Sequence, residues 1–408
     1  MRSISNHVSS VARLAGMAPK SKELDVTVDN HYTSKVYTCG SIVAGSVVIA
    51  PKRDTRFARV QVELVGRASV QLQDVYVSKR TSLLLLNVDM PVPESCYPRP
   101  RVFRAGQTYC IPFRFVLPRH LTDGACAHAV QSDIVRDAHL RLPSTLSDWD
   151  ADDMSPNFVS VRYCVRARVM YPCSPEVGEG MVALLSAEHR LNVVAPSPED
   201  PPLSIDTYDK HYNLTRSKLL RKSVFSTPLG RVTATATQPP AVHLSPDGHG
   251  AGSSSFHVRL AYKSSSPEVS PPDIGLASVK LVARTWYCAQ QMKSLPNTGA
   301  SREPFSLSTK VLWEAVVYEF WRRSDSNSTT GDAYEASLRA EFRLPTSKHV
   351  FPPTFHSCLV SRTYALEVNL DAGGGAIRLV LPIQVAMEPG DQPPQPAAAE
   401  GELPGWQA

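Results

Sequence analysis

The sequence lacks any long apolar run, and its first residues lack the apolar stretch expected of a secretory signal. The four leucines at positions 83–86 are flanked by polar residues, whereas a membrane-spanning helix needs about 18 or more consecutive apolar residues. The first 22 residues hold four basic residues and no acid, but no apolar stretch of the kind found in a secretory signal. We therefore predict that residues 1–21 are a flexible N-terminus. An Arg- and Ser-rich start without acids also suits a mitochondrial transit peptide, which is the alternative.

A strong charge of one sign is also missing. The 408 residues include 43 basic and 38 acidic ones, which gives a net charge of +5. This excess is too small for the electrostatic footprint of a nucleic-acid-binding protein, so we predict no nucleic-acid partner. The sequence has no P-loop, no dinucleotide-binding glycine fingerprint, no HExxH motif and no Gly-x-Ser-x-Gly motif. We therefore predict a protein that is not an enzyme and needs no cofactor.

The eight cysteines come without a secretory signal and are predicted to be reduced thiols. The best metal candidate is Cys126-x-His128 with Asp133, Asp137 and His139, because thiolate and imidazole ligands at this spacing suit zinc. The segment has no second closely spaced pair, however, and the prediction is that no metal binds. A metal-binding protein, or a Cys–His nucleophile made from the same residues, is the remote alternative.

What the sequence has instead is alternation of apolar and polar residues with a period of two, the pattern of strands with one buried face. Its 34 prolines punctuate these stretches, which favours short strands over long helices. The clearest alternating stretches are 24–28, 58–64, 111–115, 163–169, 256–262, 336–344, 364–370 and 377–385. They lack the three- and four-residue spacing of amphipathic helices, so the predicted fold class is all-β.

The strand patterns fall into two blocks, 22–195 and 227–388. Antiparallel sheets with one wet face pair into sandwiches, so we predict two tandem immunoglobulin-like β-sandwich domains with these bounds. A Pro-rich and basic linker, 196–226, joins them, because proline cannot continue a hydrogen-bonded ladder. Segments predicted to be mobile or disordered are 144–156, 324–331 and the tail 389–408.

Two successions of residues carry a family resemblance. In the first block they are Tyr37, Gly40, 45–49, 60–66, Tyr109, Pro112, Phe113, Phe115, Pro118, Val161, Tyr163, Val165 and Ala167. In the second block they are Leu344, Pro345, 353–355, 361–364, Leu366, Val368 and 381–383. Their order and spacing resemble the N- and C-terminal domains of the arrestin family, most of all the fungal arrestin-like proteins, or α-arrestins. The resemblance covers residues 22–388 and implies two arrestin-like domains.

Elementary physical chemistry explains four of these positions independently. Gly40 and Gly45 flank a strand start, where a positive φ or a close backbone approach favours glycine. Pro112 lies inside a strand pattern and predicts an edge strand or a bulge. Tyr163 is expected to bury its ring with its hydroxyl hydrogen-bonded. All four are interpreted as residues that specify the fold.

The resemblance implies a non-enzymatic cytoplasmic adaptor. Arrestin-family proteins recognise cytoplasmic parts of membrane receptors and transporters, and the fungal members recruit a ubiquitin ligase through Pro-Pro-x-Tyr motifs. We therefore expect recruitment to the plasma membrane or endosomes, and a role in endocytosis, trafficking or ubiquitin-linked down-regulation. This sequence has no Pro-Pro-x-Tyr, and Pro352-Pro353-Thr354-Phe355 comes closest, which puts direct recruitment of ligase machinery in doubt. A scaffold subunit of an endosomal sorting coat, resembling the arrestin-like retromer subunits, is the alternative.

Two clusters of basic residues are candidate sites for phosphate groups, either on the tail of a membrane protein or on an anionic lipid headgroup. The first cluster comprises Arg216, Lys218, Arg221, Lys222 and Arg231. The second cluster comprises Lys52, Arg53 and Arg56. The alternatives are a solvated connector for the first cluster and an ordinary sandwich surface for the second.

Overall fold

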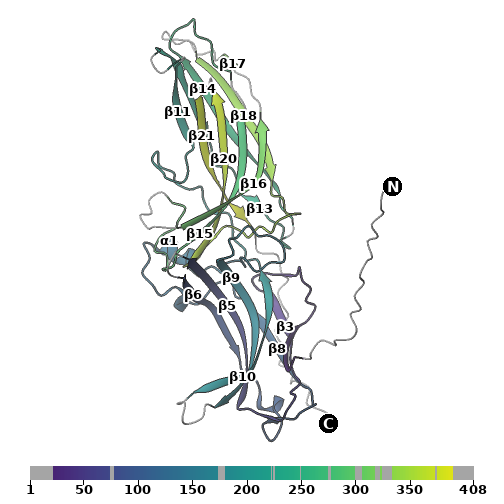
Figure 1. The fold of residues 1–408 in the computed structure, drawn as a ribbon. Coiled ribbons are helices and arrows are strands. Elements are labelled where there is room, and N and C mark those ends of the chain that lie inside the picture. The colour runs from purple at the N-terminus through teal and green to yellow at the C-terminus, as the bar shows by residue number, and fades with distance from the viewer. Residues whose placement is uncertain are drawn as a thin grey trace, which may run out of the picture.

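The protein, seen in a computed structural model, is built mostly of β-strands, with one α-helix in its described part (Figure 1). The structure describes residues 22–388, apart from 74–77, 173–179, 222, 224–225, 249, 274–276, 299–305, 318–321, 324–332 and 373–374. The predicted N-terminal flexible segment, the predicted loop 324–331 and the predicted tail lie outside these residues. No helix in the described ranges is long and apolar enough to cross a membrane. The all-β prediction is confirmed.

The described residues of the first half contain ten strands, eight of which form two main sheets. The strands are β1 (Leu24–Val28), β2 (Val36–Tyr37), β3 (Ile42–Ile49), β4 (Thr55–Arg56), β5 (Arg59–Gln73), β6 (Ser78–Met90), β7 (Val102–Phe103), β8 (Tyr109–Val116), β9 (Val159–Pro172) and β10 (Met181–Val193). One sheet has the order β1-β3-β8, the other has the order β2-β10-β9-β5-β6, and β4 pairs with β7. Buried side chains of both main sheets form one hydrophobic cluster.

The helices of the chain all lie in this half, between β6 and β9, as far as the described residues go. They are the 3-10 helices η1 (Glu94–Cys96) and η2 (Asp123–Cys126) and the α-helix α1 (Asp133–Leu140). The hydroxyl of Ser132 accepts a hydrogen bond from the amide of Val135 and so caps the start of α1. Figure 1 shows α1 at the junction between the two halves.

The second half also has two main sheets, and twelve strands are found among its described residues. They are β11 (Thr215–Arg221), β12 (Pro228–Ala236), β13 (Val242–His243), β14 (Ser253–Ser264), β15 (Ala277–Tyr287), β16 (Ser306–Val317), β17 (Arg322–Arg323), β18 (Ala333–Arg343), β19 (Phe355–His356), β20 (Val360–Ala372), β21 (Gly375–Ile383) and β22 (Val385–Ala386). One sheet has the order β11-β12-β14-β18-β17, the other has the order β16-β15-β20-β19 with β21 also paired to β20, and β13 pairs with β22. A second hydrophobic cluster draws on both main sheets.

The two halves lie end to end and share buried surface (Figure 1). Phe355, Leu359 and Val360 come from the second half but are buried within the first hydrophobic cluster. Met154 and Val194 come from the first half but are buried within the second cluster. We call this interpenetration of the two clusters the apolar seam.

The structure explains the residues that the sequence singled out for the fold. Gly40 has a φ of +85°, and a Cβ on Gly45 would lie 2.0 Å from the carbonyl oxygen of Thr27 on the paired strand. Pro112 lies on β8, at the edge of its sheet, and the buried Tyr163 donates its hydroxyl proton to the carbonyl of Pro143 at 2.7 Å. The predictions for these positions are confirmed.

Two connecting segments differ from expectation. Residues 215–221, placed in the linker, form strand β11 and pair with β12, because Leu220 turns into the second hydrophobic cluster. The segment 144–156 is anchored: Leu146 is fully buried and bridges to Val161. The side chain of Asp153 accepts hydrogen bonds from the amides of Ser147 at 2.6 Å and Ser155 at 3.0 Å. The acids of this segment therefore organise a folded loop.

Candidate anion-binding groove

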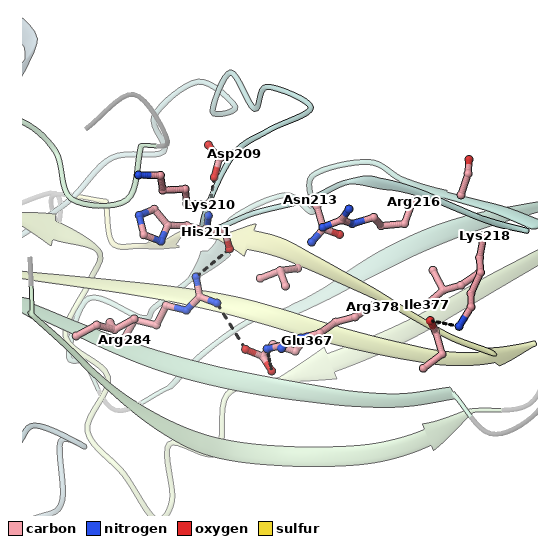
Figure 2. Close-up of a pocket in the computed structure, with 14 residues that line it drawn as sticks. Asp209, Lys210, His211, Asn213, Arg216, Lys218, Arg284, Glu367, Ile377 and Arg378 are labelled. Atoms are coloured by element: carbon pink, nitrogen blue, oxygen red, sulfur yellow. Dashed lines mark hydrogen bonds and ion pairs between the residues drawn. The ribbon is translucent and has the colours of Figure 1, made fainter. Parts of the chain in front are cut away.

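An open groove of about 860 Å³ runs between β11 and β21, on the side of the second half where two sheet edges diverge. Just before β11, Asn213 makes a single antiparallel bridge with Val380 of β21. The chain then leaves β21 and pairs with β12 from Thr215 onward. Figure 2 shows the side chains that line the resulting gap. The groove is therefore a consequence of strand topology, because two strands that start in contact end in different sheets.

The lining of the groove is strongly basic. Five basic residues line it against two acidic ones, an excess of three positive charges. The basic residues are Lys210, Arg216, Lys218, Arg284 and Arg378, and the acidic ones are Asp209 and Glu367. Such a local concentration contrasts with the nearly balanced charge of the whole chain. A concave basic surface raises the local concentration of anions and speeds their association.

Two of the basic residues, Arg284 and Arg378, form ion pairs at the bottom of the groove. Glu367 forms ion pairs with Arg284 at 3.6 Å and with Arg378 at 2.8 Å. The side chain of Arg284 is 8% exposed, donates to the carbonyl of His211 at 3.4 Å and lies 5.4 Å from the centre of the Tyr212 ring. These contacts join β15, β20, β21 and the segment before β11 (Figure 2). These contacts hold Arg284, Arg378 and Glu367 in place at the bottom of the groove. The positive charge at its opening therefore comes from Lys210, Arg216 and Lys218.

The segment before β11 is ordered by a carboxylate. Asp209 accepts hydrogen bonds from the amides of His211 at 2.8 Å and Tyr212 at 3.0 Å. The His211 ring packs edge-on against Trp286, with ring centroids 4.8 Å apart. Burial, followed by smaller effects of Arg284 and Lys210, lowers the pKa of His211, and Asp209 partly opposes this shift. His211 is therefore a neutral lining residue at neutral pH.

The backbone of β21 offers a second recognition element. The amide and carbonyl of Val380 both bond to Asn213, so they point away from β20. Backbone groups point to alternate sides along a strand, so residues two apart share a side. The amide and carbonyl of Arg378 therefore point to the same side as those of Val380, away from β20. At this position β11 has already turned away from β21. A ladder position facing a groove is a template for an added strand. On this edge Lys218 donates to the carbonyl of Ala376 at 3.5 Å.

The structure divides the first predicted basic cluster. Arg216 and Lys218 line the groove. Arg231 pairs across from Leu219 on the opposite face of the sheet, because directly opposed residues of antiparallel strands share a face. The exposed Arg221 donates to the carbonyl of Ser226 at 3.0 Å, and Lys222 lies outside the described residues. Among the described residues of this cluster, two therefore contribute side chains to the groove.

The second predicted cluster lies in the other half of the molecule, around strand β4. Arg53 and Arg56 border a smaller depression that also contains Asp54 and Glu23. Lys52 forms a long ion pair of 3.9 Å with Glu23. Because acidic groups accompany these bases, the second cluster has a weaker claim to phosphate than the groove.

Sequence reasoning missed three basic lining residues of the groove. Lys210 lies in the irregular segment before β11, Arg284 lies in β15 and Arg378 lies in β21. Arg378 was visible as a polar residue in an alternating pattern, but nothing local in the sequence placed it in one groove with Arg216. The site requires three segments that only the sheet topology brings together.

Comparison with protein-family models and with curated protein sequences gives no match for this chain.

Proposed function

We infer that the protein is a non-enzymatic, arrestin-like adaptor that binds an extended, phosphorylated cytoplasmic segment of a membrane protein in the β11–β21 groove. The observation that carries this proposal is the basic groove lying along β21, where the backbone of Arg378 faces it. Arginine and lysine side chains suit phosphate groups, and an edge strand binds extended peptides by backbone pairing. The organisation into two halves, each with two sheets, and the family resemblance of the sequence support the arrestin-like part of the proposal.

In this function the protein contributes recognition alone. The segment would lie antiparallel to β21, with its backbone on the exposed groups of Arg378 and its phosphates near Arg216 and Lys210. Glu367 is already paired with Arg284 and Arg378, so it repels an incoming phosphate less than a free carboxylate would. Delivery of the bound cargo to endocytosis or to a ubiquitin ligase would then depend on other surfaces or on a further adaptor.

The first prediction concerns charge reversal in the groove. We expect Arg216→Glu combined with Lys218→Glu to weaken binding of the full chain to a doubly phosphorylated peptide by about 100-fold, since each charge-assisted contact contributes roughly 1.5 kcal/mol. Fluorescence anisotropy of a labelled peptide measures this affinity, with the unphosphorylated peptide as a reference.

Arg231→Glu is the matched control, because it reverses an exposed charge on the opposite face of the same sheet. We expect it to change the affinity by less than about twofold, through weak long-range electrostatics. Equal losses in both variants would show that the peptide senses only net charge, and would refute the groove. In cells, proximity labelling that finds a fixed set of coat subunits, insensitive to both variants, would favour the scaffold alternative.

The second prediction concerns pH. Because burial lowers the pKa of His211 from its usual 6.5, the folded chain holds this ring neutral at pH 7. As the pH falls below 6.5, the unfolded chain takes up the proton before the folded chain does, so the stability that the neutral ring contributes is lost.

A bound anion acts in the opposite direction, because it favours the protonated, charged form of the His211 ring and is in turn bound more tightly by it. We expect the affinity for an anionic peptide to rise about fivefold between pH 7.5 and 5.5, by one added charge near the ligand.

The probe for this test is a sulfated peptide, because the second pKa of a phosphate, about 6, would itself change the ligand charge in this range. The His211→Asn variant is expected to bind with an affinity that hardly changes over the same pH range. A wild-type profile that is flat, or one that His211→Asn leaves as steep, would exclude His211 from the anion site.

A further inference from the structure

Four metal-ligating side chains meet at the junction of the two halves, far from the groove. Cys126 ends η2, His128 follows two residues later, and His139 lies in the last turn of α1. Cys358 comes from the second half, in the tight turn between β19 and β20. One ligand atom from each of these four residues lies within 4.8 Å of all the others. We call this set the Cys₂His₂ cluster.

The distances in the cluster match those around a tetrahedral metal ion. Nδ1 of His139 lies 3.6 Å from Sγ of Cys126 and 3.7 Å from Sγ of Cys358, and Nδ1 of His128 lies 3.7 Å from Sγ of Cys126. Zinc–sulfur bonds of about 2.3 Å and zinc–nitrogen bonds of about 2.05 Å at tetrahedral angles separate sulfur from nitrogen by about 3.6 Å. The three sulfur–nitrogen distances therefore need almost no rearrangement.

The rings are turned with their Nδ1 atoms toward the sulfurs. Nε2 of His128 lies 2.8 Å from the carbonyl of Met292 and donates to it, which leaves the lone pair of Nδ1 free to bind. A hydrogen bond of this kind orients metal-binding histidines and raises their basicity. The guanidinium of Arg136 contacts the carbonyl of Cys126 and lies 3.9 Å from its sulfur.

Burial makes the cluster a closed site. Cys126, His139 and Cys358 are each at most 1% exposed, and His128 is half-buried. A catalytic zinc keeps one position open for water or substrate, whereas a structural zinc takes all four ligands from the protein. A Cys–His nucleophile would need access to the sulfur, which this burial denies. The arrangement therefore fits a structural role.

We propose that Cys126, His128, His139 and Cys358 bind a zinc ion that fastens the two halves of the protein together. Mixed thiolate and imidazole ligands in tetrahedral geometry select zinc over hard cations such as calcium or magnesium. Three ligands belong to the first half and one to the second, so the ion bridges the junction at the edge of the apolar seam. The proposal is independent of the peptide groove, because the two sites share no residue.

The fourth ligand changes the interpretation of the sequence. Cys126, His128 and His139 were recognised as the best metal candidate, but Asp133 and Asp137 were grouped with them. Both aspartates are exposed on α1 and neither belongs to the cluster. Their place is taken by Cys358, which lies 219 residues after His139. The prediction that no metal binds rests on the lack of a second closely spaced pair of ligands in the sequence. The fold instead brings Cys358 to the cluster as the fourth ligand.

The experiment is metal analysis of the full chain purified under reducing conditions without chelator. We expect about one zinc ion per chain, and a roughly tenfold or greater loss of zinc in Cys358→Ser. Cys164→Ser, which changes a half-buried cysteine on β9 outside the cluster, is the matched control and should keep its zinc. Chelation of zinc from the wild type is expected to lower Tm by roughly 10 °C.

Cobalt titration of the metal-free wild type keeps the test valid if Cys358→Ser fails to fold. The absorption bands of tetrahedral cobalt with thiolate charge transfer are the expected result. The proposal is overturned if the wild type contains no stoichiometric metal and all its thiols react with an alkylating agent in the native state. It is equally overturned if peptide mapping finds Cys126 and Cys358 joined as a disulfide, or if metal content is unchanged in Cys358→Ser.

Discussion

Replacement of Glu63 by alanine is expected to lower the free energy of unfolding of the first half by about 3–5 kcal/mol, as for other broken buried ion pairs. The Glu63 side chain is 3% exposed, on β5, an inner strand of its sheet, and accepts hydrogen bonds from Arg166 and Arg168, each at 2.9 Å. Without the carboxylate, two partly buried guanidinium groups on β9 lose the acid that they share. Urea denaturation followed by circular dichroism measures the loss.

Two further variants separate charge from packing. Glu188→Ala removes an exposed carboxylate that pairs across from Arg166 on the neighbouring strand, and it should cost less than about 1 kcal/mol. Glu63→Leu combined with Arg166→Met and Arg168→Met should recover much of the stability, because apolar replacements remove the unpaired charges. A small loss in Glu63→Ala, similar to that in Glu188→Ala, would show that water already screens the cluster.

Replacement of Trp286 by alanine should destabilise the second half by about 3–5 kcal/mol, because it opens a large cavity in the core. Trp286 is 1% exposed and its Nε1 donates to the hydroxyl of Thr363 on β20 at 2.8 Å. The conservative Trp286→Phe should cost less, mainly the unmade hydrogen bond of Thr363. Chemical denaturation gives both values.

Trp286 also connects stability with the groove. His211 packs against its ring, so Trp286→Phe is expected to preserve peptide binding while Trp286→Ala weakens it. If Trp286→Ala folds with wild-type stability, the tryptophan ring contributes little to the core, and the packing described for the groove floor would be wrong.

The strands were predictable because one-sided burial imposes a period of two on a sequence. In β9, for example, Val161, Tyr163 and Val165 all turn into the hydrophobic cluster. Glycine positions such as Gly45 were predictable for the same local reason, since one backbone approaches another there. Whether the two halves match the arrestin-like domains implied by the sequence, with the predicted bounds, stays a prediction.

Strand β11 and the groove were less accessible to sequence reasoning. The residues 215–221 carry three bases and only two apolar side chains, so the composition resembled that of a solvated linker. Their strand conformation comes from pairing with β12 and from burial of Leu220 alone. The charged residues that line the groove together with Arg216 include Arg284 of β15, Glu367 of β20 and Arg378 of β21. No local sequence pattern predicts neighbours that are so distant along the chain.

The apolar seam has a practical consequence for how this protein is dissected. A gene shortened to end at residue 195 would encode a first half whose hydrophobic cluster lacks Phe355, Leu359 and Val360. The vacated surface would be apolar and open to other copies of the fragment, which is a common cause of aggregation. The matching second fragment would present those three side chains to water. Roles of the two halves are therefore better separated by point substitutions in the intact chain than by cutting it at the linker.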